Sequence, residues 1–194
     1  MLDESTSEVS FHHRGWLQME VNMNEALTAV QAREDEARQF RRTLAMFATG
    51  VAVITAPRDD GPPIGITVAS FNSVSLAPPL VLFSVDRRCL SLNDLCAASR
   101  YTVNVLDENQ RDTSNRFATA RGNKWEGVSL EGEGIGRLPG ALAAFECEPH
   151  AQHDGGDHVI FIGRVVRHSA RHDGRPLIFF GGQYRSLDTT PVAA

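Results

Sequence analysis

The stretch IGITVASFNSVSLAPPLVLFSVDRR, residues 64–88, contains the two patterns that decide the fold. In its first part, apolar residues alternate with small ones, which is the period of a β-strand with two different faces. The apolar positions are Ile64, Ile66 and Val68, and the small positions are Gly65, Thr67 and Ala69. In the second part, PLVLFSV is a continuous apolar run of the kind that forms a buried strand. The stretch therefore predicts two strands of a β-sheet.

The small face of the first strand has two explanations. Small and hydroxyl side chains leave room for a flat ligand to lie close to the backbone. They equally allow close packing of a neighbouring helix. The pattern itself favours neither explanation.

The same two periods recur on both sides of this stretch. Apolar residues three and four apart (Ala37, Phe40, Leu44, Phe47) predict a helix that starts at Asn24 and is stopped by Gly50. Further strands are expected at VAVIT (51–55), YTVNVL (101–106), LAAFECEPHA (142–151), HVIFIGRVVRHSAR (158–171) and PLIFFGGQY (176–184). Helix starts are expected near Ser91 and at Asp107, and 119–140 reads as a long loop. About seven strands without a regular βαβ order favour an antiparallel barrel or sheet.

Composition excludes several classes of function. The 194 residues suggest one domain, and the net charge of −5, without a basic stripe, argues against nucleic acid as a partner. The longest apolar run is too short to cross a bilayer, and the N-terminus lacks the features of a secretory signal. The three cysteines, Cys89, Cys96 and Cys147, form neither a zinc pattern nor a disulfide framework, which favours a cytoplasmic protein.

The turn HDGGDH, residues 153–158, raises the question of a metal site. Together with Cys147 and His150 it has the chemistry of metal ligands, but Asp-Gly-Gly-Asp between two alternating runs is a hairpin signal. Cys147 and His153 share one face of a strand whereas His150 lies on the other, so we expect no metal site. His158 opens the second strand as either a capped core residue or a ligand contact.

An anion site is a better candidate. Arg87 and Arg88 precede the helix expected at Ser91, and a helix start with nearby arginines suits a phosphate. The alternative is a solvated basic turn with a serine cap. The glycine run of residues 132–140 has Arg137 where a dinucleotide loop needs its third glycine, so a nucleotide would bind without that motif.

Several motifs in order carry a resemblance to a known family. They are TGVAVITA, GITVASFNSVSLAPPLVLFSVDRR, YTVNVL, RFA, KWEGV, HDGGDHVIFIGRV and PLIFFGGQY. Over residues 38–187 the chain resembles the flavin reductase family, whose members are small reductase components of two-component flavin-dependent monooxygenases. The resemblance implies a mainly β (α+β) fold, a six-stranded antiparallel Greek-key split β-barrel with flanking helices. It divides the chain into a partly helical N-terminal arm (1–36), the split-barrel domain (37–188) and a C-terminal tail (189–194).

The resemblance also implies the site and its ligands. Thr67, Val68, Ala69 and Ser70 match the stretch along the isoalloxazine ring, and Asp86, Arg87 and Ser91 match the segment around ribityl and phosphate. His158 matches the histidine near the nicotinamide and is the expected catalytic residue. The remaining candidates for the flavin pocket are Arg116, Phe117, Lys124 and Tyr184. HDGGDH then reads as a hairpin that sets His158 at the mouth of that pocket.

The implied activity is hydride transfer from NADH or NADPH to FMN or FAD. The expected partners are a separate oxygenase that receives reduced flavin and a second copy of the chain in a homodimer. Two alternatives remain open at this level: an enzyme that holds its flavin tightly and acts on another small molecule, as pyridoxamine phosphate oxidases do, or a non-enzymatic flavin carrier or sensor.

Overall fold

The computed structural model describes residues 26–58, 60–120, 122–131 and 136–188. The chain divides into two compact units, Met1–Met46 and Phe47–Ala194. Most of the expected N-terminal arm (residues 1–25) and the whole tail (189–194) lie outside the described residues. Among the helices that are described, none combines the length and the apolar character needed to span a bilayer.

The first unit contributes one helix over residues 26–44. The apolar spacing that predicts it is confirmed at Ala37, Phe40 and Leu44, but the predicted end at Gly50 is wrong. Gly50 has no left-handed backbone and instead forms strand β1 (Thr49–Gly50). The reason is a tertiary one, because Gly50 pairs with Ile178 from the far end of the chain.

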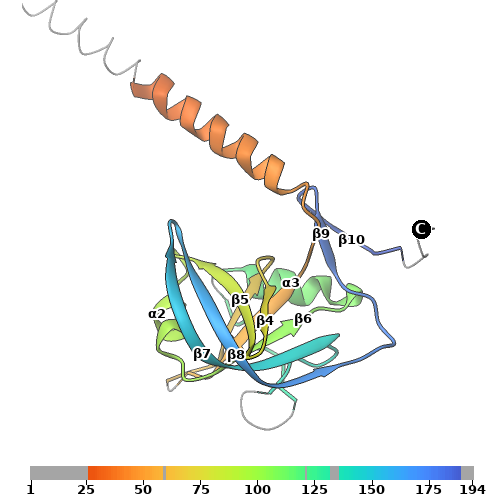
Figure 1. The fold of residues 1–194 in the computed structure, drawn as a ribbon. Coiled ribbons are helices and arrows are strands. Elements are labelled where there is room, and N and C mark those ends of the chain that lie inside the picture. Colours follow the sequence, from red (N-terminus) through yellow and green to blue (C-terminus); the bar gives the residue numbers. More distant parts are fainter. Residues whose placement is uncertain (1–25, 59, 121, 132–135, 189–194) are drawn as a thin grey trace, which may run out of the picture. The chain divides into compact units, whose positions relative to one another are not determined.

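The second unit is built on a seven-stranded sheet in which all neighbouring strands are antiparallel, in the order β3-β2-β6-β7-β8-β5-β4 (Figure 1). Its strands are β2 (Ala52–Ala56), β3 (Ile64–Val68), β4 (Asn72–Leu76), β5 (Pro79–Asp86), β6 (Tyr101–Val105), β7 (Ala143–Gly155) and β8 (His158–Ala170). Every strand expected in this region is present. The expectation missed only β4, a short strand between two predicted ones.

Alternation along the strands decides which side chains form the core. Ile64 and Val68 of β3 are buried beside Val81, Phe83 and Val85 of β5, as the period of two predicts. The ring of Phe83 stacks on Phe161 of β8 with centroids 5.1 Å apart and meets Tyr101 edge to face. A second apolar cluster forms around Val51, Val53, Leu106, Phe117 and Leu138.

A second, three-stranded sheet has the order β1-β9-β10, with β9 at Ile178–Phe180 and β10 at Gln183–Arg185. PLIFFGGQY was expected to be one strand, and that expectation is wrong. Gly181 and Gly182 have φ of 61° and 76°, so they form a tight turn that folds the segment into a hairpin.

The helices of the second unit start close to the predicted residues. Ser91 is the N-cap residue of α2 (Leu92–Ala97), although its hydroxyl makes no cap hydrogen bond. Asp107 caps the short 3₁₀ helix η1 (Glu108–Gln110) through a reciprocal capping box, and α3 (Arg111–Ala118) follows directly.

Candidate functional site

The small face of β3 packs against α3 and the loop that follows it. A Cβ built on Gly65 would come within 3.0 Å of two ring carbons of Phe117 and within 3.2 Å of Trp125. The Thr67 hydroxyl donates to the Ser114 carbonyl of α3 at 2.7 Å. The packing explanation therefore holds for Gly65 and Thr67, and the space beside Gly65 is not free for a flat ligand.

The residues that follow β3 are not part of this packing, because the pairing of β3 with β2 ends at Val68. Ser70 Oγ donates to the Ser84 carbonyl at 3.1 Å and accepts from the Ser84 N–H at 2.9 Å, which ties this segment to β5. In the described part of the chain, no protein hydrogen bond engages the backbone N–H groups of Ala69 and Ser70. Two free donors on an anchored segment suit the polar edge of a flavin ring, whose oxygens and nitrogens accept hydrogen bonds. Val68, in contrast, is a buried core residue.

The segment after β5 is organised by arginines. Asp86 accepts hydrogen bonds from the backbone and guanidinium of Arg88, which hold the pKa of Asp86 well below its usual range. Arg87 turns to the β7–β8 hairpin and donates to Asp154 and to the Gly156 carbonyl, both at 2.8 Å. The alternative of a solvated basic turn therefore fits Arg88, whose side chain is exposed. It does not fit Arg87, whose guanidinium is hydrogen-bonded to the β7–β8 hairpin.

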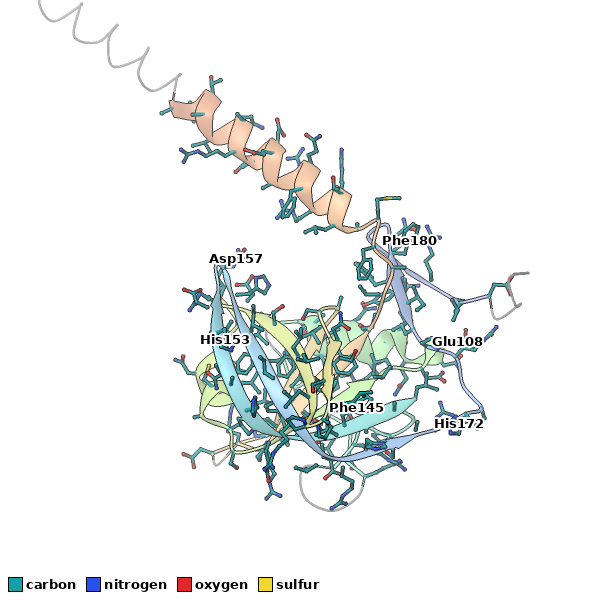
Figure 2. The ribbon with its side chains drawn as sticks, in the orientation of Figure 1. Glu108, Phe145, His153, Asp157, His172 and Phe180 are labelled. Atoms are coloured by element: carbon teal, nitrogen blue, oxygen red, sulfur yellow. The ribbon has the colours of Figure 1, made fainter. Side chains whose placement is uncertain are left out.

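His158 is the first residue of β8, as expected, and lies opposite Asp86 of β5 in the strand register. Its side chain is 40% exposed, and Nδ1 lies 2.7 Å from an Asp157 carboxylate oxygen. A carboxylate on Nδ1 orients the ring and leaves Nε2 for a ligand. Of the two alternatives for His158, the structure does not show the capped core residue, because the imidazole is accessible close to the tip of the hairpin, where Figure 2 labels the neighbouring Asp157.

The candidates around α3 are held mainly by protein contacts. Phe117 is 1% exposed, and its side chain packs in the core against Trp125. Lys124 Nζ donates to the carbonyls of Gly65 and Phe117 at 3.1 and 3.3 Å, and burial lowers the pKa of its ammonium group. Arg116 donates to the Glu126 carbonyl at 2.8 Å. Phe117 and Lys124 thus pack against β3 at Gly65, whereas Arg116 stabilises the loop after α3.

Tyr184 of β10 also joins α3. Its hydroxyl lies 2.8 Å from Ser114 Oγ and donates to Asn115 Oδ1 at 3.0 Å, while Arg111 lies over its ring. Because Thr67 donates to the carbonyl of the same serine, Ser114 links two of the candidates.

Three residues of this region were not among the candidates. Arg58, from the loop after β2, donates to Ser91 Oγ at 3.2 Å and pairs with Asp94, so it brings a cation to the segment expected around a phosphate. Ser114 could have been suspected from its spacing of three from Phe117, which puts both on the buried face of α3. Asp154 was considered as a turn residue and as a possible metal ligand, and no local signal pointed to its arginine partner.

Comparison with known proteins agrees with this geometry. Residues 43–188 match the family described as flavin reductase like domain. The chain is 43% identical over 152 residues to FMN reductase (NADH) SmoA of Agrobacterium fabrum, covering 77% of this chain and 86% of that protein. It is 39% identical over 162 residues to HsaB of Rhodococcus jostii, a reductase subunit of a flavin-dependent monooxygenase, covering 82% and 83%.

A solved structure shows the same fold. The NADH:FAD oxidoreductase SgcE6 of Streptomyces globisporus, in complex with NAD and FAD fragments, superposes with a TM-score of 0.75 at 34% identity, covering 80% of this chain and 94% of that one. The family match over residues 43–188 includes all the strands of both sheets. The chain therefore belongs to the flavin reductase family.

Proposed function

We propose that this protein oxidises NADH with a flavin and passes the reduced flavin to a separate oxygenase. The relatives support this, since SmoA is named an FMN reductase (NADH) and HsaB a reductase subunit of a monooxygenase. When bound, the flavin supplies the hydride acceptor, N5, and the nicotinamide supplies the donor carbon, C4. The work left to the chain is to hold the two rings against each other and exclude side reactions.

One observation carries the proposal. The backbone N–H groups of Ala69 and Ser70 lie close to His158, because both are connected to the end of strand β5. Ser70 is bonded to Ser84, and Asp86, two residues further along β5, is paired with His158. With about 3.3 Å of rise per residue and about 4.8 Å between strands, the Cα atoms of Ser84 and His158 lie about 8 Å apart. The donors of Ala69 and Ser70 would hold the flavin ring, and the segment from Asp86 to Ser91 would border its ribityl phosphate.

His158 is the residue we assign to the nicotinamide. Because Asp157 engages Nδ1, the ring is held at one side and Nε2 is left for the carboxamide of the nicotinamide. Hydride transfer requires no general base, so the role is positioning rather than proton transfer. Lys124 and Tyr184 act indirectly in this scheme by supporting β3 and α3.

We also propose a homodimer in the cytoplasm. Strand β4 ends the seven-stranded order, and its Leu76 is 93% exposed beside the exposed Val74. An edge strand with exposed apolar side chains suits burial against a second copy. Light scattering of the purified protein tests this, and a monomer at micromolar concentration would contradict it. The three free cysteines fit a reducing compartment.

The test of the function is the oxidation of NADH, followed by its near-ultraviolet absorbance, with and without FMN, FAD or riboflavin. We expect saturable oxidation that depends on added flavin. His158→Ala should raise the KM for NADH about tenfold, the equivalent of ~1.4 kcal/mol, with flavin affinity within about twofold of wild type. His150→Ala is the matched control, because His150 lies on the same hairpin but away from its tip. A yellow protein that oxidises no NADH would refute the proposal.

A further inference from the structure

The guanidinium of Arg87 is directed away from the β5–α2 segment and onto the tip of the β7–β8 hairpin. Arg87 Nε donates to the Gly156 carbonyl and Nη2 donates to Asp154 Oδ1, both at 2.8 Å. The Arg87 backbone N–H donates to the Asp157 carbonyl at 2.9 Å. Three of the four residues between His153 and His158 are thus bonded to one arginine.

The turn that receives these bonds is a two-residue hairpin turn, closed by the pairing of Gly155 with His158. Gly156 has a φ of 75° and follows Gly155, and a Cβ on Gly156 would meet nothing within 4 Å. Two consecutive glycines give the unrestrained tip many accessible conformations. One internal bond helps, from the Gly156 N–H to Asp154 Oδ1 at 3.0 Å, and this is the same oxygen that accepts from Arg87. Arg87 therefore restrains the turn at the atom on which its internal order depends.

This arrangement differs from the other arginine–carboxylate pair on the same two strands. Arg164 and Glu148 lie on neighbouring positions of β8 and β7 and form one bond across the ladder at 2.6 Å. Arg87 directly follows β5 and reaches the turn, so it connects the end of a third strand to the hairpin. In both pairs the side chains are about half exposed or more, and exposed pairs contribute little to stability. The contribution of Arg87 is accordingly to geometry rather than to the free energy of unfolding.

We propose that Arg87 is a positioning residue for His158, an inference that rests on the function proposed above. His158 directly follows the restrained turn and pairs with Gly155 on one side and Asp86 on the other. Arg87 fixes the tip relative to β5, which also borders the expected flavin segment. The arginine thus sets the spacing between the nicotinamide side and the flavin side of the site, and its guanidinium is committed to the hairpin rather than to the flavin phosphate.

The experiment compares Arg87→Met and Asp154→Ala with Asp154→Asn. We expect the first two to raise the KM for NADH about fivefold, with kcat and flavin affinity within about twofold of wild type. Asp154→Asn should stay close to wild type, because its Oδ1 still accepts from Arg87 and Gly156. Arg164→Met is the matched control, since it removes the other cross-strand arginine and should change none of these values.

Two further measurements separate positioning from general damage. In a double-mutant cycle, Arg87→Met should add no more than about twofold to the NADH KM of His158→Ala, because the arginine acts through the histidine. Without any ligand, amide hydrogen exchange at Gly155–His158 should be faster in Arg87→Met and Asp154→Ala than in wild type or Arg164→Met. Unchanged melting temperatures would show that all variants fold.

The possible failures are distinct. An active wild type whose Arg87→Met variant keeps both its NADH KM and its slow exchange would overturn the positioning role alone. An Arg87→Met variant that loses flavin affinity while keeping its NADH KM would assign Arg87 to the flavin phosphate and overturn the inference. A wild type that oxidises no NADH would overturn the proposed function, and the role of Arg87 with it.

Discussion

The substitution Gly65→Ala is the sharpest test of how strand β3 packs against α3. The new methyl group would lie within 3.0 Å of two Phe117 ring carbons and within 3.2 Å of Trp125 Cζ2. Carbon atoms in contact prefer about 3.5–4.0 Å, so the Phe117 ring must move by roughly 1 Å. That ring is 1% exposed and anchored in a core cluster, so it has little room to move.

The expected magnitude follows from two opposing effects. Overpacking a core costs about 1–3 kcal/mol. Replacing glycine by alanine restricts the unfolded chain and offsets about 0.4–1 kcal/mol of that cost. The net loss of about 1–2 kcal/mol corresponds to a Tm lowered by about 2–8 °C for a chain of this size.

Thermal unfolding followed by circular dichroism measures this change. Gly50→Ala is the control, because a Cβ there meets nothing within 4 Å and its backbone is not left-handed, so Tm should stay within about 1 °C. Phe117→Leu in the Gly65→Ala background should restore part of the loss relative to the two single variants. If Gly65→Ala keeps its Tm but loses flavin affinity, the small residue serves the ligand and the packing argument is refuted.

Two further outcomes are expected from buried polar groups. Tyr101→Phe should leave Tm unchanged or raise it, because the buried Tyr101 hydroxyl has no hydrogen-bond partner among the described residues, and burial, with a smaller effect of Cys147, raises its pKa. A fall of several degrees would reveal a hidden partner. Asp107→Asn should destabilise by about 1–3 kcal/mol at neutral pH, because Asp107 accepts from the Asn109 N–H and pairs with Arg171. These bonds lower the pKa of Asp107 below its ordinary value of 3.8, so its contribution is present above that pH and lost as pH falls through the lower folded pKa. Denaturant melts of wild type and Asp107→Asn should therefore converge toward pH 2, and a constant gap would contradict the assignment.

Local patterns predicted most of the second unit. Alternation identified β3 and β5, and the composition of HDGGDH identified the β7–β8 turn. The carboxylate at Asp107 identified a helix start, and the structure adds the capping box that it forms with Gln110. Each of these features depends on residues within a few positions of one another, so each can be predicted from the sequence.

The errors arose where a distant segment decided the outcome. Gly50 reads as a helix stop, but pairing with β9 makes it part of a strand. The edge strand β4 carries no strong alternation and exists because β5 pairs with it. The surroundings of candidate side chains show the same limit, because Thr67 and Phe117 contact protein groups of α3 and its neighbours that lie far from β3 in the sequence.

The strand periods, the tight turns, the helix starts and the family motifs can be identified from consecutive residues alone, because they follow from the side chains of neighbouring positions. Only the tertiary structure decided which polar groups remain available to a ligand. It commits the Arg87 guanidinium to a hairpin from another part of the chain, and within the described residues it gives the N–H groups of Ala69 and Ser70 no hydrogen-bond partner. The physical reason is that a hydrogen-bonding group is satisfied by whatever the sheet register brings within 3 Å, and no local pattern encodes that partner.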